Sequence, residues 1–119
     1  MESIRRMARK FLLISLTFLA YGIPVTGVLA AQAGPLTITR IRTGWASDTF
    51  AIETSQAVVN PAGCTAPDGY VSDSSHPGYK TYYAATLMAF SSGKPVTLII
   101  SDTECHSGRP KIMGVYVTK

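Results

Sequence analysis

The sequence predicts a mainly β fold that contains one α-helix, and three observations support this prediction. Short segments rich in β-branched residues are separated by turn-forming residues. One segment in the second half of the chain repeats large side chains at three- and four-residue spacing, which is typical of a helix. The two cysteines lie on either side of this segment. We therefore expect one small domain in which a disulfide spans the helix.

Three segments before the helix are expected to form strands. Residues 36–43 are rich in β-branched side chains and mostly alternate in polarity, as a half-buried strand does. Residues 44–48 have the composition of a turn, and residues 49–54 follow as a second strand, so the two strands form a hairpin. Residues 57–59 are a shorter candidate strand that ends at Asn60-Pro61.

A helix of about 14 residues is expected next, as its start and stop signals bound it. Ser74 or Ser75 can cap its N-terminus, with Pro77 in the first turn. Gly93 provides a C-terminal stop, and Pro95 prevents the helix from continuing. We expect the tyrosines of this helix to pack in and around the core rather than to form a ligand platform. The large side chains at helical spacing are Tyr79, Tyr82, Tyr83, Thr86, Leu87 and Phe90.

Two more strands complete the expected fold. Residues 96–100 form a buried strand and residues 111–118 the final strand, while residues 61–78 and 101–110 are expected to be loops. The resulting order is β-β-β-α-β-β. This order matches a small five-stranded barrel of the oligonucleotide/oligosaccharide-binding type. The alternative is an α+β sheet with one helix packed across a face.

The N-terminus has the three-part pattern of a secretory signal peptide. Four basic side chains and one acid occur in the first ten residues, and residues 11–39 carry no charge. The apolar run ends in Ala31-Gln32-Ala33, an A-x-A cleavage signal, and cleavage after Ala30 fits nearly as well. We therefore expect residues 1–33 to be a cleaved signal peptide and residues 34–119 to be a single periplasmic or secreted domain.

Two alternatives for the leader remain. The apolar run is long enough to be an uncleaved membrane anchor, but its helix breakers and clustered alanines favour cleavage, after which no membrane span is expected. The pair Arg5-Arg6 is compatible with twin-arginine export, but the residues that follow give it no further support.

The charge of the chain does not indicate nucleic-acid binding. The formal net charge is +4, of which the leader contributes +3 through four basic residues and one acid. Seven basic and six acidic residues remain after residue 33, a balance of +1. Phosphate binding needs a clustered basic face, and these seven residues are scattered along the chain. No nucleic-acid partner is expected.

The cysteines predict a disulfide between Cys64 and Cys105, because an exported chain with two cysteines most simply pairs them. A zinc site that also used His76 and His106 was considered, but the short ligand clips of structural zinc sites were not found. No metal and no cofactor are expected. Catalysis is not expected either, because the chain has no Gly-x-Ser-x-Gly elbow and its Ser91-Ser92-Gly93-Lys94 segment lies at a helix end, which is unsuited to phosphate binding.

Candidate ligand-binding residues follow from the predicted barrel. In such barrels the first hairpin loop and the loop between the last two strands bind ligands. Here these are residues 44–48 and 102–110. The tryptophan of the first loop either caps the barrel or offers a flat face to a sugar ring, and the other polar residues can hydrogen-bond hydroxyls or carboxylates. The candidates are Trp45, Ser47, Asp48, Glu104, His106 and Arg109.

Part of the chain resembles known proteins. The stretch from Gly63-Cys64 to Cys105 and Arg109-Pro110-Lys111-Ile112 resembles a group of small, exported, single-disulfide bacterial proteins. More distantly, the helix followed by Ser92-Gly93-Lys94-Pro95-Val96 is similar to B subunits of AB5 toxins of the pertussis-like and subtilase cytotoxin kind. That resemblance implies a glycan-binding barrel that assembles into a pentameric ring. The sugar-contacting residues of those subunits do not match position by position, so none is transferred.

These observations together predict a non-enzymatic, exported binding module. A glycan is the first candidate ligand, and a homo-oligomer is expected if the toxin-like resemblance holds. The alternative is a protein-interaction or inhibitor component of the periplasm or envelope, which would bind a protein partner.

Overall fold

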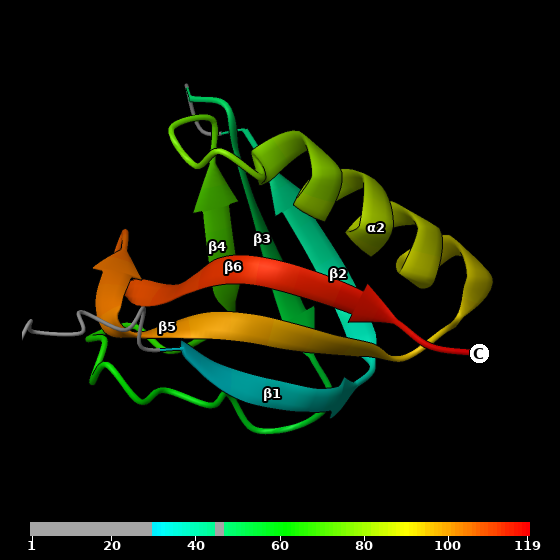
Figure 1. Cartoon of the computed structure of the whole chain (residues 1–119), viewed down its shortest axis with the longest axis horizontal. Coiled ribbons are helices and arrows are strands. Elements are labelled where there is room, and N and C mark those ends of the chain that lie inside the picture. The colour runs from blue at the N-terminus through cyan, green and yellow to red at the C-terminus, as the bar shows by residue number, and fades with distance from the viewer. Residues whose placement is uncertain (1–29, 45–46) are drawn as a thin grey trace, which may run out of the picture.

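The computed structural model describes residues 30–44 and 47–119. It confirms a mainly β fold with one helix (Figure 1). No helix within these residues is both long and apolar enough to cross a membrane. The elements in chain order are β1 (Ala30–Leu36), β2 (Ile38–Thr43), β3 (Thr49–Thr54), β4 (Tyr70–Asp73), α2 (Tyr79–Ser92), β5 (Val96–His106) and β6 (Arg109–Val117).

The strands form one six-stranded mixed sheet in the order β1-β5-β6-β4-β3-β2. All neighbours are antiparallel except β4 and β6. The five-stranded barrel is not confirmed, because β1 and β2 stand at opposite ends of this order and the sheet is not closed in the described part of the chain. Only Thr37 separates these two strands along the chain, so the sheet must curve strongly. Figure 1 accordingly shows β1, β5 and β6 running across the steeper β2, β3 and β4.

The first predicted strand is divided in the structure. Residues 36–43 were expected to be continuous, but Leu36 ends β1 and Ile38 begins β2. β1 also includes residues 30–33, which the leader prediction assigns to the cleaved peptide. These residues pair with β5, Ala30 opposite Ser101 and Ala33 opposite Leu98, and Ala33 is buried. The structure thus makes residues 30–33 part of the sheet.

Two predictions in the segment before the helix are wrong. Residues 57–59 do not form a strand, and the Val59 backbone N–H instead donates to the Tyr70 hydroxyl at 2.8 Å. The predicted loop 61–78 contains the short strand β4, which joins β3 to β6. β4 has only four residues, and its pairing partners are remote in the sequence, so its position depends on tertiary contacts rather than on local pattern.

The helix is confirmed, with an error at its N-terminus. α2 has 14 residues and ends at Gly93, which is in the left-handed conformation that favours glycine at this position. The predicted serine caps are wrong, because the N-cap is Gly78 and no side chain caps it. Ser75 instead donates its backbone N–H to Asp73 at 2.9 Å. The serines before the helix therefore shape the turn after β4.

The last two strands are longer than predicted. Residues 101–110 were expected to be a loop, but β5 continues to His106 and β6 begins at Arg109. Ser107 and Gly108 form a two-residue turn with φ values of 51° and 73°. Positive φ at both positions is typical of the type I′ turn, which matches the twist of a β-hairpin. The structure therefore has a tight, strand-paired hairpin tip where a loop was expected.

The core lies between the curved sheet and α2. Its largest fully buried side chains are Phe50, Ile52, Tyr70, Leu98, Ile100 and Ile112. The helix tyrosines pack against it as expected: the Tyr79 and Tyr83 rings have their centroids 5.6 and 5.1 Å from that of Phe50. The Tyr82 hydroxyl donates to the Met113 carbonyl at 2.5 Å, which fastens α2 to β6.

Candidate functional site

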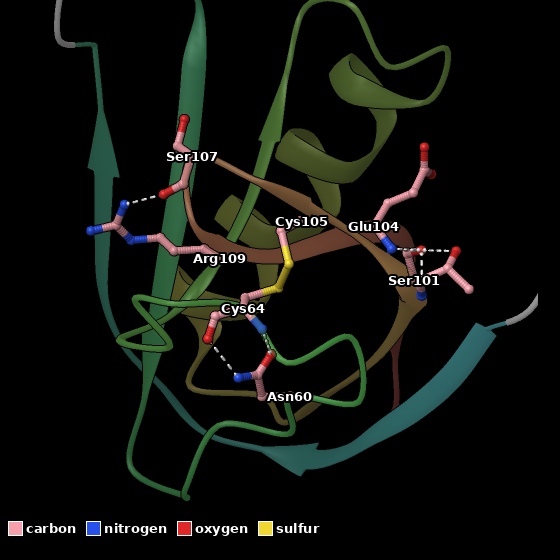
Figure 2. The surroundings of a disulfide bond; sticks show 8 residues. Asn60, Cys64, Ser101, Glu104, Cys105, Ser107 and Arg109 are labelled. Atoms are coloured by element: carbon pink, nitrogen blue, oxygen red, sulfur yellow. Dashed lines mark hydrogen bonds between the residues drawn. A yellow bond between two sulfur atoms is a disulfide. The ribbon is translucent and has the colours of Figure 1, made fainter.

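The hairpin tip is fastened to the loop before β4 by the predicted disulfide. Cys64 and Cys105 are bonded to each other, so neither sulfur is available as a thiolate ligand for zinc (Figure 2). Asn60 holds Cys64 in place, because its side-chain amide donates to the Cys64 carbonyl at 2.9 Å and accepts the Cys64 N–H at 2.8 Å. The Ala66 N–H also donates to the Gly108 carbonyl at 2.8 Å. These bonds fix the position of the tip.

A charged network lies on one side of the tip. Arg109 forms a two-pronged pair with Asp68, in which Nη2 and Oδ2 lie 2.9 Å apart. Arg42 Nη2 donates to the same carboxylate at 3.3 Å, and Arg42 Nε lies 3.0 Å from Glu53 Oε1. Arg40 extends the network to Glu53 at 3.4 Å. Three guanidinium groups thus share two carboxylates, which leaves one excess positive charge.

The pairing of Arg109 with Asp68 perturbs both groups. The hydrogen bond from Arg109 holds the pKa of Asp68 below its usual value, and the hydrogen bond to Asp68 raises the pKa of Arg109. Arg109 also donates Nη1 to the Ser107 carbonyl at 2.9 Å, as Figure 2 shows. Because its donors converge on these acceptors, the guanidinium is held against the turn rather than free in solvent.

A cavity of about 370 Å³ opens beside this network. It lies between the β2–β3 hairpin and the tip of the β5–β6 hairpin. Three apolar residues form part of its wall: Phe50, Ala51 and Val71. The polar lining combines two guanidinium groups with hydroxyl-bearing side chains: Arg42, Thr43, Ser47, Thr49, Ser107 and Arg109. Apolar residues combined with a few polar groups are the usual lining of a small-molecule site.

The predicted ligand-binding residues are not all at this cavity. Ser47 and Arg109 line it, and Trp45 lies outside the described residues. Asp48 faces α2, where it accepts a hydrogen bond from the Tyr79 hydroxyl at 2.7 Å. Burial and this contact raise the pKa of Tyr79 to about 12. Glu104 forms an ion pair with Lys111 at 3.1 Å, and Figure 2 shows its side chain on the opposite side of the disulfide from Arg109.

The sixth predicted residue, His106, belongs to a separate cluster with Asp73 and His76. His106 Nε2 lies 2.5 Å from Asp73 Oδ2, and His76 Nε2 lies 3.7 Å from Asp73 Oδ1. The two imidazole rings meet edge to face with their centroids 5.2 Å apart. His76 is buried and its Nδ1 lies 2.8 Å from Ser72 Oγ. We call Asp73, His76 and His106 the histidine cluster.

The local sequence explains how the histidine cluster is held. Asp73 ends β4, and the His76 N–H donates to its carbonyl at 2.9 Å, which closes a tight turn. Burial acts to raise the pKa of Asp73, but the hydrogen bonds from Ser75 and the adjacent histidines outweigh it and lower this pKa. Burial also lowers the pKa of His76, which Asp73 only partly offsets. His106 arrives from β5, next to the disulfide.

Sequence reasoning missed the histidine cluster because it searched for cysteine and histidine ligands only. The available signal was Asp73-Ser74-Ser75-His76, a carboxylate and an imidazole separated by two residues. That spacing predicts nothing about His106, which lies 30 positions beyond His76 in the numbering. Only the fold brings the three side chains together.

The sequence of this chain matches no protein-family model and no curated protein. Inferences about its function therefore rest on the geometry of the cavity and of the histidine cluster.

Proposed function

We propose that this protein is an exported, non-enzymatic binding module whose cavity takes a saccharide. One observation carries the proposal: two segments expected to bind ligand, residues 44–48 and 102–110, contribute to the wall of the same cavity. These segments are far apart in the sequence, and the fold places them together. The disulfide supports the exported part of the proposal, because disulfides persist in oxidising compartments.

The chemistry of the cavity suits a polar ring with an apolar face. Its volume lies within the range of about 300–1,000 Å³ that small-molecule sites have. The hydroxyls of Ser47, Thr49 and Ser107 are hydrogen-bonding groups for sugar hydroxyls. The apolar wall offers contact area to the carbon-bound hydrogens of a sugar. The excess positive charge of the adjacent network favours saccharides that carry a carboxylate over neutral ones.

The proposal is tested by narrowing the cavity from its apolar wall. Ala51→Leu adds three carbon atoms beside the cavity, and Ala57→Leu makes the same change at an exposed position that does not line it. The wild type and both variants are applied to a glycan array with neutral and acidic saccharides. The affinity for each saccharide that binds is then measured by calorimetry. We expect Ala51→Leu to weaken binding at least about tenfold and Ala57→Leu to leave it unchanged.

Two outcomes would contradict the proposal. One is an array without signal beside a lectin that binds normally. The other is equal binding by the wild type and Ala51→Leu, which would show that any saccharide binds elsewhere. Circular dichroism of both variants shows whether the fold is retained.

A further inference from the structure

We propose that the histidine cluster is a binding site for a divalent transition-metal ion, with Zn²⁺ the best match. This site is separate from the saccharide cavity and does not depend on it. Asp73 provides a carboxylate oxygen, and His76 and His106 each provide an imidazole nitrogen. Two imidazoles and one carboxylate are a ligand set that zinc and its neighbours bind well.

The distances are close to those that a metal ion requires. The three ligand atoms all lie within 4.8 Å of one another. Bonds of about 2.0–2.1 Å in tetrahedral geometry place ligand atoms about 3.3 Å apart. His106 Nε2 lies 2.5 Å from Asp73 Oδ2 and must move away, and His76 Nε2 lies 3.7 Å from the other oxygen, Oδ1, and must move closer to the oxygen that binds the ion. The separation of the two imidazole nitrogens is bounded at 4.8 Å, so closing the shell requires movements of up to about 1.5 Å.

The fold presents these ligands in a pattern found in metal sites. Asp73 and His76 form a short clip, since two residues separate them and a backbone hydrogen bond closes the turn. His106 comes from a remote strand and completes the set. Its position is restrained by the neighbouring disulfide at Cys105. A local clip combined with a remote, rigidly held ligand lowers the entropy that the ion must overcome when it orders its ligands.

A further contact orients one of the imidazoles. Ser72 is fully buried, and its hydroxyl lies 2.8 Å from His76 Nδ1, which directs Nε2 towards Asp73. Ligating histidines commonly use their second nitrogen in such a hydrogen bond. The Asp73 N–H lies 3.3 Å from the same Nδ1 and favours a proton on Nε2 in the metal-free chain. Metal binding at Nε2 requires the tautomer with its proton on Nδ1, which donates to Ser72 Oγ and gives up the 3.3 Å contact from the Asp73 N–H.

The surroundings leave the site open on one side. The His76 side chain is 8% exposed, whereas that of His106 is 29% exposed, so solvent reaches the cluster from the hairpin tip. Three protein ligands with an open position allow water to complete a tetrahedral shell. Lys111 is a nearby cation that opposes the ion, and its 3.1 Å pairing with Glu104 offsets this charge.

Calorimetric titration of Zn²⁺ into the oxidised, tag-free protein tests the site. We expect one equivalent to bind with a Kd of about 10 µM or tighter. His106→Gln removes a partly exposed ligand and should weaken binding at least about tenfold. Asp73→Asn removes the carboxylate ligand and should weaken binding at least about tenfold as well. Asp68→Asn is its matched control, because it neutralises the carboxylate paired with Arg109, and it should change the Kd less than about twofold.

A second measurement keeps the test independent of variant folding. In the wild-type protein, the imidazole NMR resonances of both histidines should shift together on addition of one equivalent of Zn²⁺. Co²⁺ should give the intense visible absorption of a tetrahedral site. The proposal is overturned if Zn²⁺, Co²⁺, Ni²⁺ and Cu²⁺ all fail to bind stoichiometrically. It is also overturned if folded His106→Gln binds as the wild type does, or if only one histidine responds.

Discussion

The two sides of the β5–β6 hairpin tip have the same arrangement but different functional groups: each pairs a basic side chain with an aspartate, through a guanidinium on one side and an imidazole on the other. Arg109 and His106 are cross-strand partners at the turn, and each contacts an aspartate near one end of β4. Arg109 pairs with Asp68 before β4, and His106 contacts Asp73 at its end. The first pair joins permanent charges and orders the wall of a cavity. The second places two imidazole nitrogens around a carboxylate. One tight turn thus positions the cavity wall on one side and the histidine cluster on the other.

Breaking the disulfide should have the largest effect, because it removes a restraint common to both sides. Cys64 and Cys105 are 41 residues apart, and closing such a loop restricts the unfolded chain by about 4 kcal/mol. The double variant Cys64→Ser/Cys105→Ser should lose about this much stability in chemical denaturation. Saccharide and Zn²⁺ affinity should fall together. Loss of only one activity would show that the two sides are positioned independently.

Removing residues 30–33 of β1 should have a smaller effect and leave both sides of the hairpin tip in place. A chain that starts at Gly34 lacks the pairing of residues 30–33 with β5, whereas a chain that starts at Ala31 keeps most of it. We expect the shorter chain to be less stable by about 2 kcal/mol, from lost strand hydrogen bonds and the buried Ala33. Denaturation of both chains measures this difference. If the stabilities are equal, residues 31–33 contribute little, and a domain that begins after Ala33 would be as stable as the longer chain.

Arg109→Gln should have the smallest effect on stability, and it changes the Arg109 side of the tip without changing the histidine cluster. It should cost about 1 kcal/mol, because Asp68 is largely exposed. The folded pKa of Asp68 lies below its ordinary value of 3.8, so the pair stabilises the fold above that pH. This contribution is lost as the pH falls through the folded pKa. The stability difference between wild type and variant should therefore shrink in acid. A difference that persists there would contradict the ion-pair assignment. Zn²⁺ affinity should be unaffected.

Local signals predicted what depends on local structure. The helix and its end at Gly93 follow from side-chain spacing and from the left-handed conformation that glycine adopts easily. The first hairpin follows from two β-branched segments around a turn. By contrast, β4 has four residues and partners that are remote in the sequence. The hairpin tip was missed because Ser107-Gly108 is one of many small polar pairs that are compatible with a loop or with a tight turn.

The candidate residues divide in the same way. Ser47 and Arg109 were predicted to bind ligand, and both line the cavity, but Asp48 and Glu104 are directed to α2 and to Lys111. Polarity identifies a side chain that can bind, but it does not specify which face of the fold the side chain occupies. His106 was predicted as a residue of the ligand loop and instead joins the histidine cluster.

The disulfide partners, the mainly β composition and the helix can be predicted from the sequence, because each depends on residue identity or on short-range spacing. The open, curved six-stranded sheet in place of a five-stranded barrel, and the convergence of Asp73, His76 and His106, follow only from the complete fold. The physical reason is distance along the chain. Pairing across tens of residues is selected by the packing of the whole core, which no short segment encodes.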